Sequence, residues 1–482
     1  MLKKLGALAL GLALLLAGCS KEKPTLEARW QFVGADGLRT ATAPLGVRAM
    51  FAAPRAAEIG DRLVTNVTKE VGKWLSGGTM VDPAVDAALH PIVEDLLSHE
   101  SKGEIWRASN GEREVVLAVK VTKERADIWV KAWSEAWSKA SSKKRVISVS
   151  ADRGWLFAVS DLDAGLLPGL KKEVLDTPPP HSLFSVEGAL ASVPKYKLEA
   201  INAKGKVKWA GHFAAPSLQI QKLPEWSVPT NIVRDPMIAF TALRGFSPLL
   251  FDQLGLSDLL PEEKPGQIFV WSQPEIPFQS GLAVEMTDPA RFGARTANRL
   301  LPYFQGRPDG THWNGQLFID TNTFVIRMMD SLLAPALVPA KGEGKRFSIL
   351  AFAPPPRSNS PPAPELLVEL KKPGTVYYDW EITSENAEHW GGLLSSFDAI
   401  RTLIPPGSKS PGQQWLWGCS TNLGNTITRV TQTTPGEFDL VRNSDSGLSA
   451  MELVLFSRWV DPPQTIAERR RTHLIPAPHR PK

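Results

Sequence analysis

Apolar and polar positions along this chain follow a pattern that recurs. An apolar run, a stretch with helical spacing and a pair of alternating segments follow one another in three regions, Val115–Ser160, Gly281–Met329 and Tyr377–Arg442. Alternation with a period of two is typical of half-buried strands, whereas apolar residues three and four positions apart are typical of helices. The pattern predicts a strand–helix–strand–strand unit that occurs three times, least regularly in the last region.

Other segments add helices and strands to this outline. Helical spacing predicts two helices between Arg55 and His99, and the first of them ends before Gly77 and Gly78. Further strands are predicted at 183–190, 206–213 and 217–223. The predicted fold class is α+β, with repeated strand–helix–strand–strand units forming antiparallel sheets backed by helices.

The N-terminus has the organisation of a signal peptide. Lys3 and Lys4 precede an uncharged run from Leu5 to Leu16. As a helix this run would rise about 18 Å, which is less than the hydrocarbon core of a bilayer at about 30 Å. The run ends in Leu16-Ala17-Gly18-Cys19, which resembles the lipobox of bacterial lipoproteins.

The lipobox resemblance covers only the residues up to Cys19, and it implies a covalent modification there. The Cys19 thiol would carry a diacylglyceryl group, the signal peptide would be removed before it, and the new amine would often be acylated, as with palmitate. The resemblance implies export and a covalent lipid anchor in the cell envelope, facing the periplasm or the outside. Ser20 stands where an aspartate commonly retains lipoproteins at the inner membrane, so the outer membrane is favoured. An ordinary secretory signal with a coincidental cysteine is the alternative.

Composition narrows the picture a little further. The formal net charge of +5 is too mild for the basic footprint of a nucleic-acid-binding protein, so no nucleic-acid partner is expected. With Cys19 modified, Cys419 is the second and last cysteine, and it has no partner for an intramolecular disulfide. No pKa-lowering neighbour lies beside Cys419 in the sequence, so we expect a buried, inert thiol.

Proline clusters mark the expected domain breaks. Asp176–His181 and Ala353–Glu365 are rich in proline, which removes backbone donors and fixes φ. The expected order is a signal peptide (1–18), the lipidated cysteine with a polar tether and a first strand (19–50), an N-terminal α+β domain (51–175), a middle α+β domain (181–352), a proline-rich linker (353–365), a C-terminal α+β domain (366–462) and a basic disordered tail (463–482).

No strong catalytic or metal-binding motif appears in the sequence. It has no G-x-S-x-G, H-E-x-x-H, G-x-G-x-x-G or P-loop pattern, and its eight histidines are scattered. We therefore nominate no catalytic residue, no metal ligand and no cofactor. Aspartates and glutamates are too numerous for their spacing to single out a glycosidase-like pair, so that arrangement stays open.

Tryptophans provide the only candidate ligand surface. Trp129, Trp133 and Trp137 recur at every fourth position, which aligns three indoles on one helical stripe. The stripe is either the face that packs the helix onto its sheet, which we favour, or an aromatic platform for a ligand. Trp415 and Trp417 would share one face if their stretch is extended, and they allow the same two interpretations.

Three hypotheses of function follow. The first is an exported, membrane-anchored lipoprotein with a structural or binding role, whose partner is an envelope protein or a glycan. The second is an extracytoplasmic hydrolase of cell-wall or carbohydrate substrates, which predicts a pocket with two carboxylates or a Ser/His pair of perturbed pKa. The third, a carbohydrate-binding module, predicts exposed coplanar indoles at Trp129, Trp133 and Trp137 or at Trp415 and Trp417, and burial of all five would exclude it.

Overall fold

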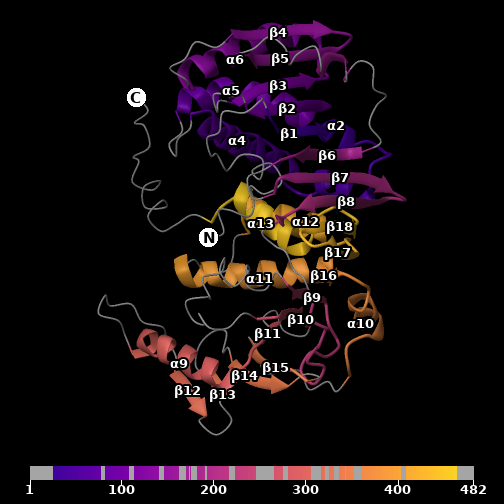
Figure 1. The fold of residues 1–482 in the computed structure, drawn as a ribbon. Helices are drawn as coiled ribbons and strands as arrows, with labels where there is room; N and C mark the ends of the chain where they lie inside the picture. Colours follow the sequence, from indigo (N-terminus) through magenta and orange to yellow (C-terminus); the bar gives the residue numbers. More distant parts are fainter. Residues whose placement is uncertain are drawn as a thin grey trace, which may run out of the picture. The chain divides into compact units, whose positions relative to one another are not determined.

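The computed structural model of the protein describes most of the chain between Thr25 and Pro463 (Figure 1). The described residues are 25–76, 82–107, 113–140, 146–161, 170–172, 174, 182–189, 193–216, 223–245, 265–274, 280–305, 316–320, 325–329, 336–341, 344–351, 360–402 and 409–463. The signal peptide, Cys19 and the expected basic tail after residue 463 lie outside them. No helix among the described residues is long and apolar enough to cross a membrane.

The chain divides into two units that are interleaved in sequence. Unit 1 contains residues 1–211, 394–423 and 445–482, and unit 2 contains 212–393 and 424–444. The expected domains at 51–175, 181–352 and 366–462 follow different boundaries, because residues 181–211 belong to unit 1 and the segment 366–462 is shared between both units. The proline-rich Ala353–Glu365 is not a boundary, since the chain on both sides of it belongs to unit 2.

Unit 1 begins with a strand and a set of helices. Its elements are β1 (Thr25–Phe32), α2 (Gly34–Leu38), α3 (Leu45–Ala52), α4 (Ala56–Leu75), α5 (Pro83–Ser98), β2 (Ser101–Arg107), β3 (Arg113–Val119), α6 (Ala126–Ala140), β4 (Val146–Asp152), β5 (Trp155–Asp161), β6 (Ser182–Gly188), β7 (Lys195–Ala203), β8 (Lys206–Ala214), α12 (Pro411–Ser420) and α13 (Ala450–Val460). The two helices expected between Arg55 and His99 are α4 and α5. The chain passes into unit 2 within β8.

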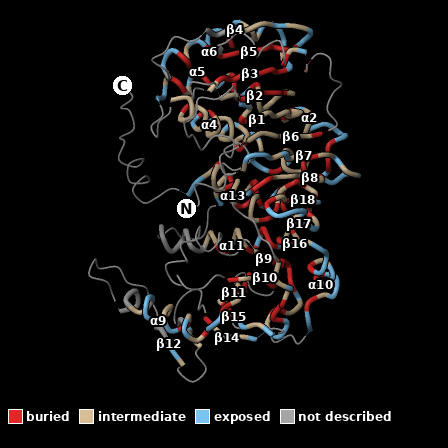
Figure 2. The backbone as a smooth tube through the Cα atoms, viewed as in Figure 1, coloured by how far each residue is buried: buried red, intermediate tan, exposed pale blue. Residues whose placement is uncertain are grey.

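The strands of unit 1 form an antiparallel sheet. Their order is β4–β5–β3–β2–β1–β6–β7. Apolar residues of α5 and α6 pack on one face of β3 and β5. The opposite face of the same two strands is covered around Leu170 and Val174, so β3 is buried on both sides and reads as a continuous apolar run. Figure 2 shows this burial concentrated in β2, β3 and β5.

Unit 2 is built around a second antiparallel sheet. Its elements are β9 (Ala239–Arg244), β10 (Gln267–Ser272), β11 (Ser280–Glu285), α9 (Pro289–Gln305), β12 (Gln316–Asp320), β13 (Val325–Met329), β14 (Ala336–Lys341), β15 (Arg346–Ala351), α10 (Pro364–Leu370), β16 (Thr375–Ile382), α11 (Thr383–Thr402), β17 (Asn425–Thr434) and β18 (Glu437–Ser444). The chain passes back into unit 1 within α11, at residue 394. The strand order is β12–β13–β14–β15–β11–β10–β9–β16–β17–β18.

The predicted repeat and the α+β fold class are confirmed. The three regions form β3–α6–β4–β5, β11–α9–β12–β13 and β16–α11–β17–β18, and the last also contains α12 before its strand pair. Their pairings differ, because β3 pairs with β5, β16 pairs with β17, and β11 pairs with β15, which follows its hairpin. One sequence pattern therefore supports three different strand orders.

Candidate functional site

The tryptophan stripe of α6 belongs to the core of unit 1. Trp129, Trp133 and Trp137 are only 0, 3 and 5% exposed, and they pack against α5, β3 and β5. The indole N–H of Trp129 donates to Asp95 of α5 at 2.8 Å. The same carboxylate accepts two hydrogen bonds from Arg125. The platform interpretation of this stripe is therefore wrong, because the sheet covers the indoles.

The second pair of tryptophans does not form a shared face either. Trp415 and Trp417 lie in α12, where two residues apart means nearly opposite sides of the helix. Trp415 is buried and donates to the carbonyl of Met50 at 2.9 Å. Trp417 is 38% exposed, and the Lys409 ammonium lies 3.7 Å from its ring centroid. The prediction of an extended stretch around Trp415 and Trp417 is therefore wrong. Of the five candidate tryptophans, only Trp417 has an exposed indole.

Cys419 is a buried, free thiol of α12, as expected. Burial raises its pKa to about 12, which keeps the thiol protonated and unreactive at neutral pH. The lipid attachment predicted at Cys19 lies outside the described residues.

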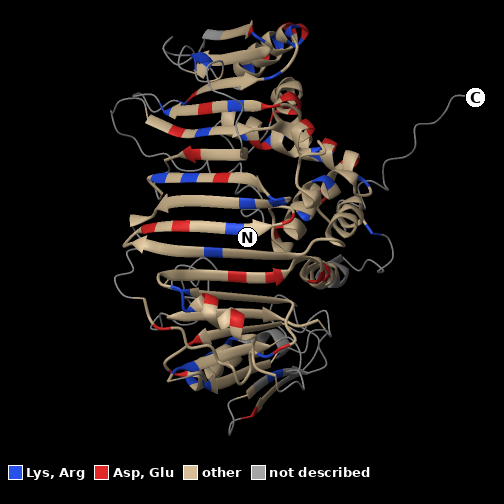
Figure 3. Cartoon of the chain, turned by 90° about the vertical axis from the view of Figure 1, so that its right-hand side faces the viewer, with Lys and Arg blue, Asp and Glu red and all other residues tan. Residues whose placement is uncertain are grey.

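Charges of both signs are interspersed along the strands in the view of Figure 3. Many of them form local ion pairs, such as Glu27 with Arg113 at 2.7 Å and Lys345 with Glu285 at 2.6 Å. The feature that stands out is instead a groove in unit 2, where charged and aromatic side chains meet on one sheet face.

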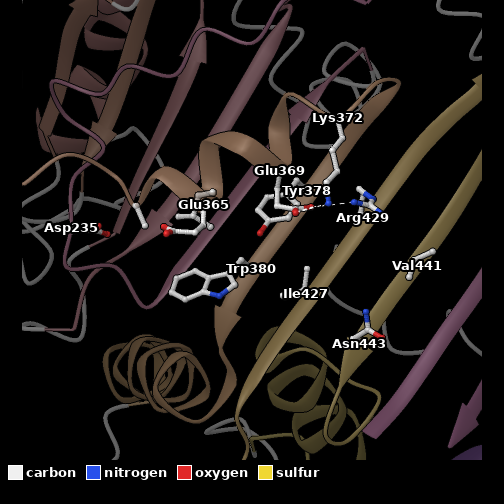
Figure 4. A pocket seen from close by; sticks show the side chains of 12 residues that line it. Asp235, Glu365, Glu369, Lys372, Tyr378, Trp380, Ile427, Arg429, Val441 and Asn443 are labelled. Atoms are coloured by element: carbon white, nitrogen blue, oxygen red, sulfur yellow. Dashed lines mark hydrogen bonds and ion pairs between the residues drawn. The ribbon is translucent and has the colours of Figure 1, made fainter. Parts of the chain in front are cut away.

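The groove lies where the sheet of unit 2 is only partly covered. Leu366 and Leu370 of α10 cover the apolar residues of β9, β10 and β16, including Phe240 and Tyr378. Next to α10 the same face continues over β17 and β18 as a hollow of about 590 Å³ (Figure 4). Its lining residues are Asp235, Ala363, Glu365, Leu366, Glu369, Lys372, Tyr378, Trp380, Ile427, Arg429, Val441 and Asn443.

The floor of the groove consists of two rows across three strands. Strand register places Trp380, Ile427 and Asn443 side by side in one row. The neighbouring row is Tyr378, Arg429 and Val441. Partners in an antiparallel register share a face, so all six side chains point to the groove side.

Glu369 of α10 organises one end of the groove. Its carboxylate accepts from Lys372 at 2.5 Å and from Arg429 at 3.1 Å. Tyr378 lies beneath it, and burial together with Glu369 and Asp379 raises the pKa of its phenol to about 12. This end therefore keeps a net positive charge, because two cations share one carboxylate, and the phenol keeps its proton.

The other end of the groove is acidic. Asp235 precedes β9, Glu365 lies in α10, and Figure 4 shows both near the indole of Trp380. Burial raises the pKa of Asp235, the backbone N–H of Ala363 opposes that effect, and the charge of Glu365 adds to it. The two carboxyl groups are thus close enough to influence each other.

The opposite face of the same sheet holds a buried polar layer. A row across the sheet runs through Ser444, Thr426, Glu381, Ala239, Ser272 and Ser280, all of them buried. Helix α11 supplies the partners, because Asn386 donates to Glu381 at 2.7 Å and Thr383 lies 2.7 Å from Thr426. Hydrogen bonds of this kind hold the first turns of α11 on the sheet.

A serine–histidine pair lies at the β11 end of this buried polar layer. Ser280 Oγ lies 2.7 Å from His389 Nε2 and 3.1 Å from Ser272 Oγ. Burial lowers the pKa of His389 to about 4, so the imidazole is neutral at neutral pH. A neutral histidine beside a serine is the arrangement of a general base and a nucleophile. Both side chains are over 90% buried and neither lines the groove, so substrate has no described route to them.

The described residues contain no cluster of histidine, cysteine, aspartate and glutamate able to hold a metal ion. Sequence reasoning missed every groove residue, because they come from five separate segments. One local signal was present for α10, where Pro364 occupies the first helical turn and Leu366 and Leu370 are four residues apart. The expected boundary between the proline-rich linker (353–365) and the C-terminal domain (366–462) instead fell inside this helix.

Comparison with known proteins gives no assignment. No protein-family model matches the chain, no curated protein is significantly similar to it, and no solved structure matches its fold.

Proposed function

We propose that this chain is an exported lipoprotein that binds a ligand in the groove of unit 2. A lipid on Cys19 would attach it to the cell envelope, with the outer membrane favoured by Ser20. The observation that carries the binding role is the open row of Trp380, Ile427 and Asn443 beside α10. Ile427 is 37% exposed although it is a large apolar residue on a strand. An indole and an isoleucine in a concave, partly charged setting are typical of ligand sites.

Binding is favoured over catalysis by the groove's composition. Its described lining contains no serine, threonine, cysteine or histidine. Lys372 and Arg429 are both paired with the carboxylate of Glu369, and fixed ion pairs suit the positioning of a ligand better than proton transfer. A glycan or a segment of an envelope protein fits the aromatic and polar row.

Ligand binding in the groove is tested by measuring the Tm of the purified full chain in the presence of each member of a panel of solutes. Ile427→Ser removes the exposed apolar side chain, and Phe318→Ser makes a matched change at another exposed strand position of unit 2, 52% exposed. We expect a solute class that raises the Tm of the wild type and of Phe318→Ser but not of Ile427→Ser. If every stabilising solute acts equally on all three proteins, the groove is not the binding site.

The lipid anchor is tested by metabolic labelling with a fatty-acid analogue in a bacterium. Cys19→Ala is expected to lose the label and to leave the membrane fraction, because no thiol remains at the processing site. Cys419→Ala is the matched control and is expected to keep both label and fractionation, since Cys419 is buried. Labelling retained in Cys19→Ala would contradict the anchor.

A second candidate function, hydrolysis of a cell-wall or carbohydrate substrate, draws on Asp235 and Glu365. A raised pKa on one member of a carboxyl pair is what a general acid requires. Under this alternative the chain releases new reducing ends from cell-wall glycans, and Glu365→Gln stops that release. Binding without any turnover by the wild type would exclude it.

A further inference from the structure

The groove's charges are distributed unevenly between its two ends. Glu369 accepts from both basic residues of the lining, Lys372 and Arg429. Asp235 and Glu365 form no ion pair with a basic residue in the described part of the chain. The acidic end therefore offers two carboxyl groups to whatever enters the groove.

The surroundings of Asp235 disfavour the ionised form of its carboxyl group. Burial raises the pKa of Asp235, and the neighbouring Glu365 raises it further. Like charges in a partly desolvated site favour an incoming cation and disfavour an anion such as phosphate. A ligand that brings one positive charge to this end relieves the repulsion between the carboxyl groups.

Trp380 adds the second element of cation recognition. Its indole lies beside Glu365 at the acidic end (Figure 4). An ammonium group over an indole face is attracted by the ring's electron density, and carboxylates nearby strengthen that attraction. From Trp380 the row continues to Ile427 and Asn443, two strand spacings away, or about 10 Å. That length accommodates a body of roughly two sugar rings behind the cationic group.

We infer that the groove binds ligands that carry a protonated primary amine, with Asp235 and Glu365 as counter-ions and the Trp380 indole as the contact face. The inference rests on the proposed binding function and names the chemical class of its ligand. An amino sugar and a polyamine both supply this group, and the experiment separates these two sources.

The test measures binding of amine probes to the full chain by isothermal titration calorimetry. The probes are a glucosamine tetramer, its fully N-acetylated form, and spermidine, at about pH 6, where the amines are protonated. The two tetramers differ in charge and acetylation but share the same rings. We expect the glucosamine tetramer to bind about tenfold more tightly than the acetylated form.

Matched variants assign the preference to the acidic end. Glu365→Gln is expected to remove most of the tenfold difference, whereas Glu388→Gln, an exposed position on α11, leaves it unchanged. Affinity for the amine is also expected to fall on acidification, and earlier than for an ordinary aspartate because the pKa of Asp235 is raised. Tight spermidine binding would show that the amine alone suffices, and binding of the glucosamine tetramer alone would assign the ligand to amino sugars.

Two results would overturn the inference, and they have different consequences. Equal affinities for both tetramers, each lost in Ile427→Ser, would reject the amine and leave the binding function standing. No binding by either amine probe would also reject the amine, and the solute panel then decides the binding function separately. A preference for the amine that persists in both Glu365→Gln and Ile427→Ser would place the site elsewhere and reject both.

Discussion

At the scale of single residues, unit 2 keeps polar groups where an apolar core would be simpler. His389, Glu381 and Asn386 are each less than 5% exposed, yet they lie between α11 and the sheet. Buried polar groups are tolerated only when hydrogen-bonded, and here the Ser280 hydroxyl of β11 is the partner of His389, while Asn386 donates to Glu381. The layer therefore fixes the position of α11 on the sheet through directional contacts. Such contacts also make the position sensitive to protonation.

His389 makes stability depend on acidity. Its pKa is about 4 in the folded protein against 6.5 in the unfolded chain. As the pH falls below 6.5, the imidazole of the unfolded chain becomes protonated, whereas that of the folded protein stays neutral until about pH 4. The contribution of His389 to stability is therefore complete above pH 6.5 and is lost as the pH falls from 6.5 to 4. The loss amounts to about 3 kcal/mol. Unfolding in urea across this range is expected to show a smaller acid loss for His389→Gln than for the wild type. Identical pH dependence in both proteins would contradict a buried neutral histidine.

At the scale of elements, the sequence predicts which segments form but not how they associate. The helix at 56–75 and the strand pairs of all three repeats lie where periodicity placed them. Helices α12 and α13 were missed although each carries a capping box, Ser410 with Gln413 and Ser449 with Glu452. In α12 the spacing of Trp415 and Trp417 also fits a strand, whereas the capping box specifies a helix.

The groove could not be predicted from the sequence for a different reason. Trp380 and Ile427 become neighbours only through the register of β16 and β17. The pairing of these strands shifts register between Thr375 and Tyr377, and local propensity specifies neither the register nor the shift. Asp235 and Glu365 come from irregular segments, whose spatial placement periodicity does not address.

Two glycines give opposite predictions for the same substitution. Gly60 lies inside α4 with open space at its Cβ position, so Gly60→Ala is expected to stabilise by about 1 kcal/mol. Gly281 of β11 faces Trp271, and an added Cβ would lie 2.2 Å from the indole. Gly281→Ala is therefore expected to destabilise by about 1–3 kcal/mol through forced repacking. Chemical unfolding of both variants checks the signs, and a stabilised Gly281→Ala would show that the indole moves freely.

At the scale of the whole molecule, the late segments of the chain complete unit 1. Asp461, just after α13, accepts from Arg62 of α4 and from the Gly412 N–H of α12. Asn66 of α4 donates to the carbonyl of Trp459 at 3.0 Å. The two contacts of α4 with the end of α13 join residues more than three hundred positions apart in sequence.

Asp461→Ala is expected to loosen these helices. The substitution leaves the Arg62 guanidinium and the Gly412 N–H without their shared acceptor, at a cost of about 2–3 kcal/mol. Hydrogen exchange is expected to accelerate in α4, α12 and α13 while β16–β18 of unit 2 keep their protection. Asp61→Ala, an exposed change on α4, serves as the control. Faster exchange spread equally through both units would contradict the division of the chain.

The interleaving of the units also sets an order of assembly. Every residue of unit 2 has been synthesised by position 444, whereas unit 1 awaits residues 445 onward. A growing chain can therefore complete the later-starting unit first, while the strands and helices of 25–211 still lack α13. For the export proposed above, the consequence is that unit 1 stays incompletely folded for as long as the chain is still being made. Unit 1 would then complete its fold only when α13 becomes available, after the rest of the chain has been made.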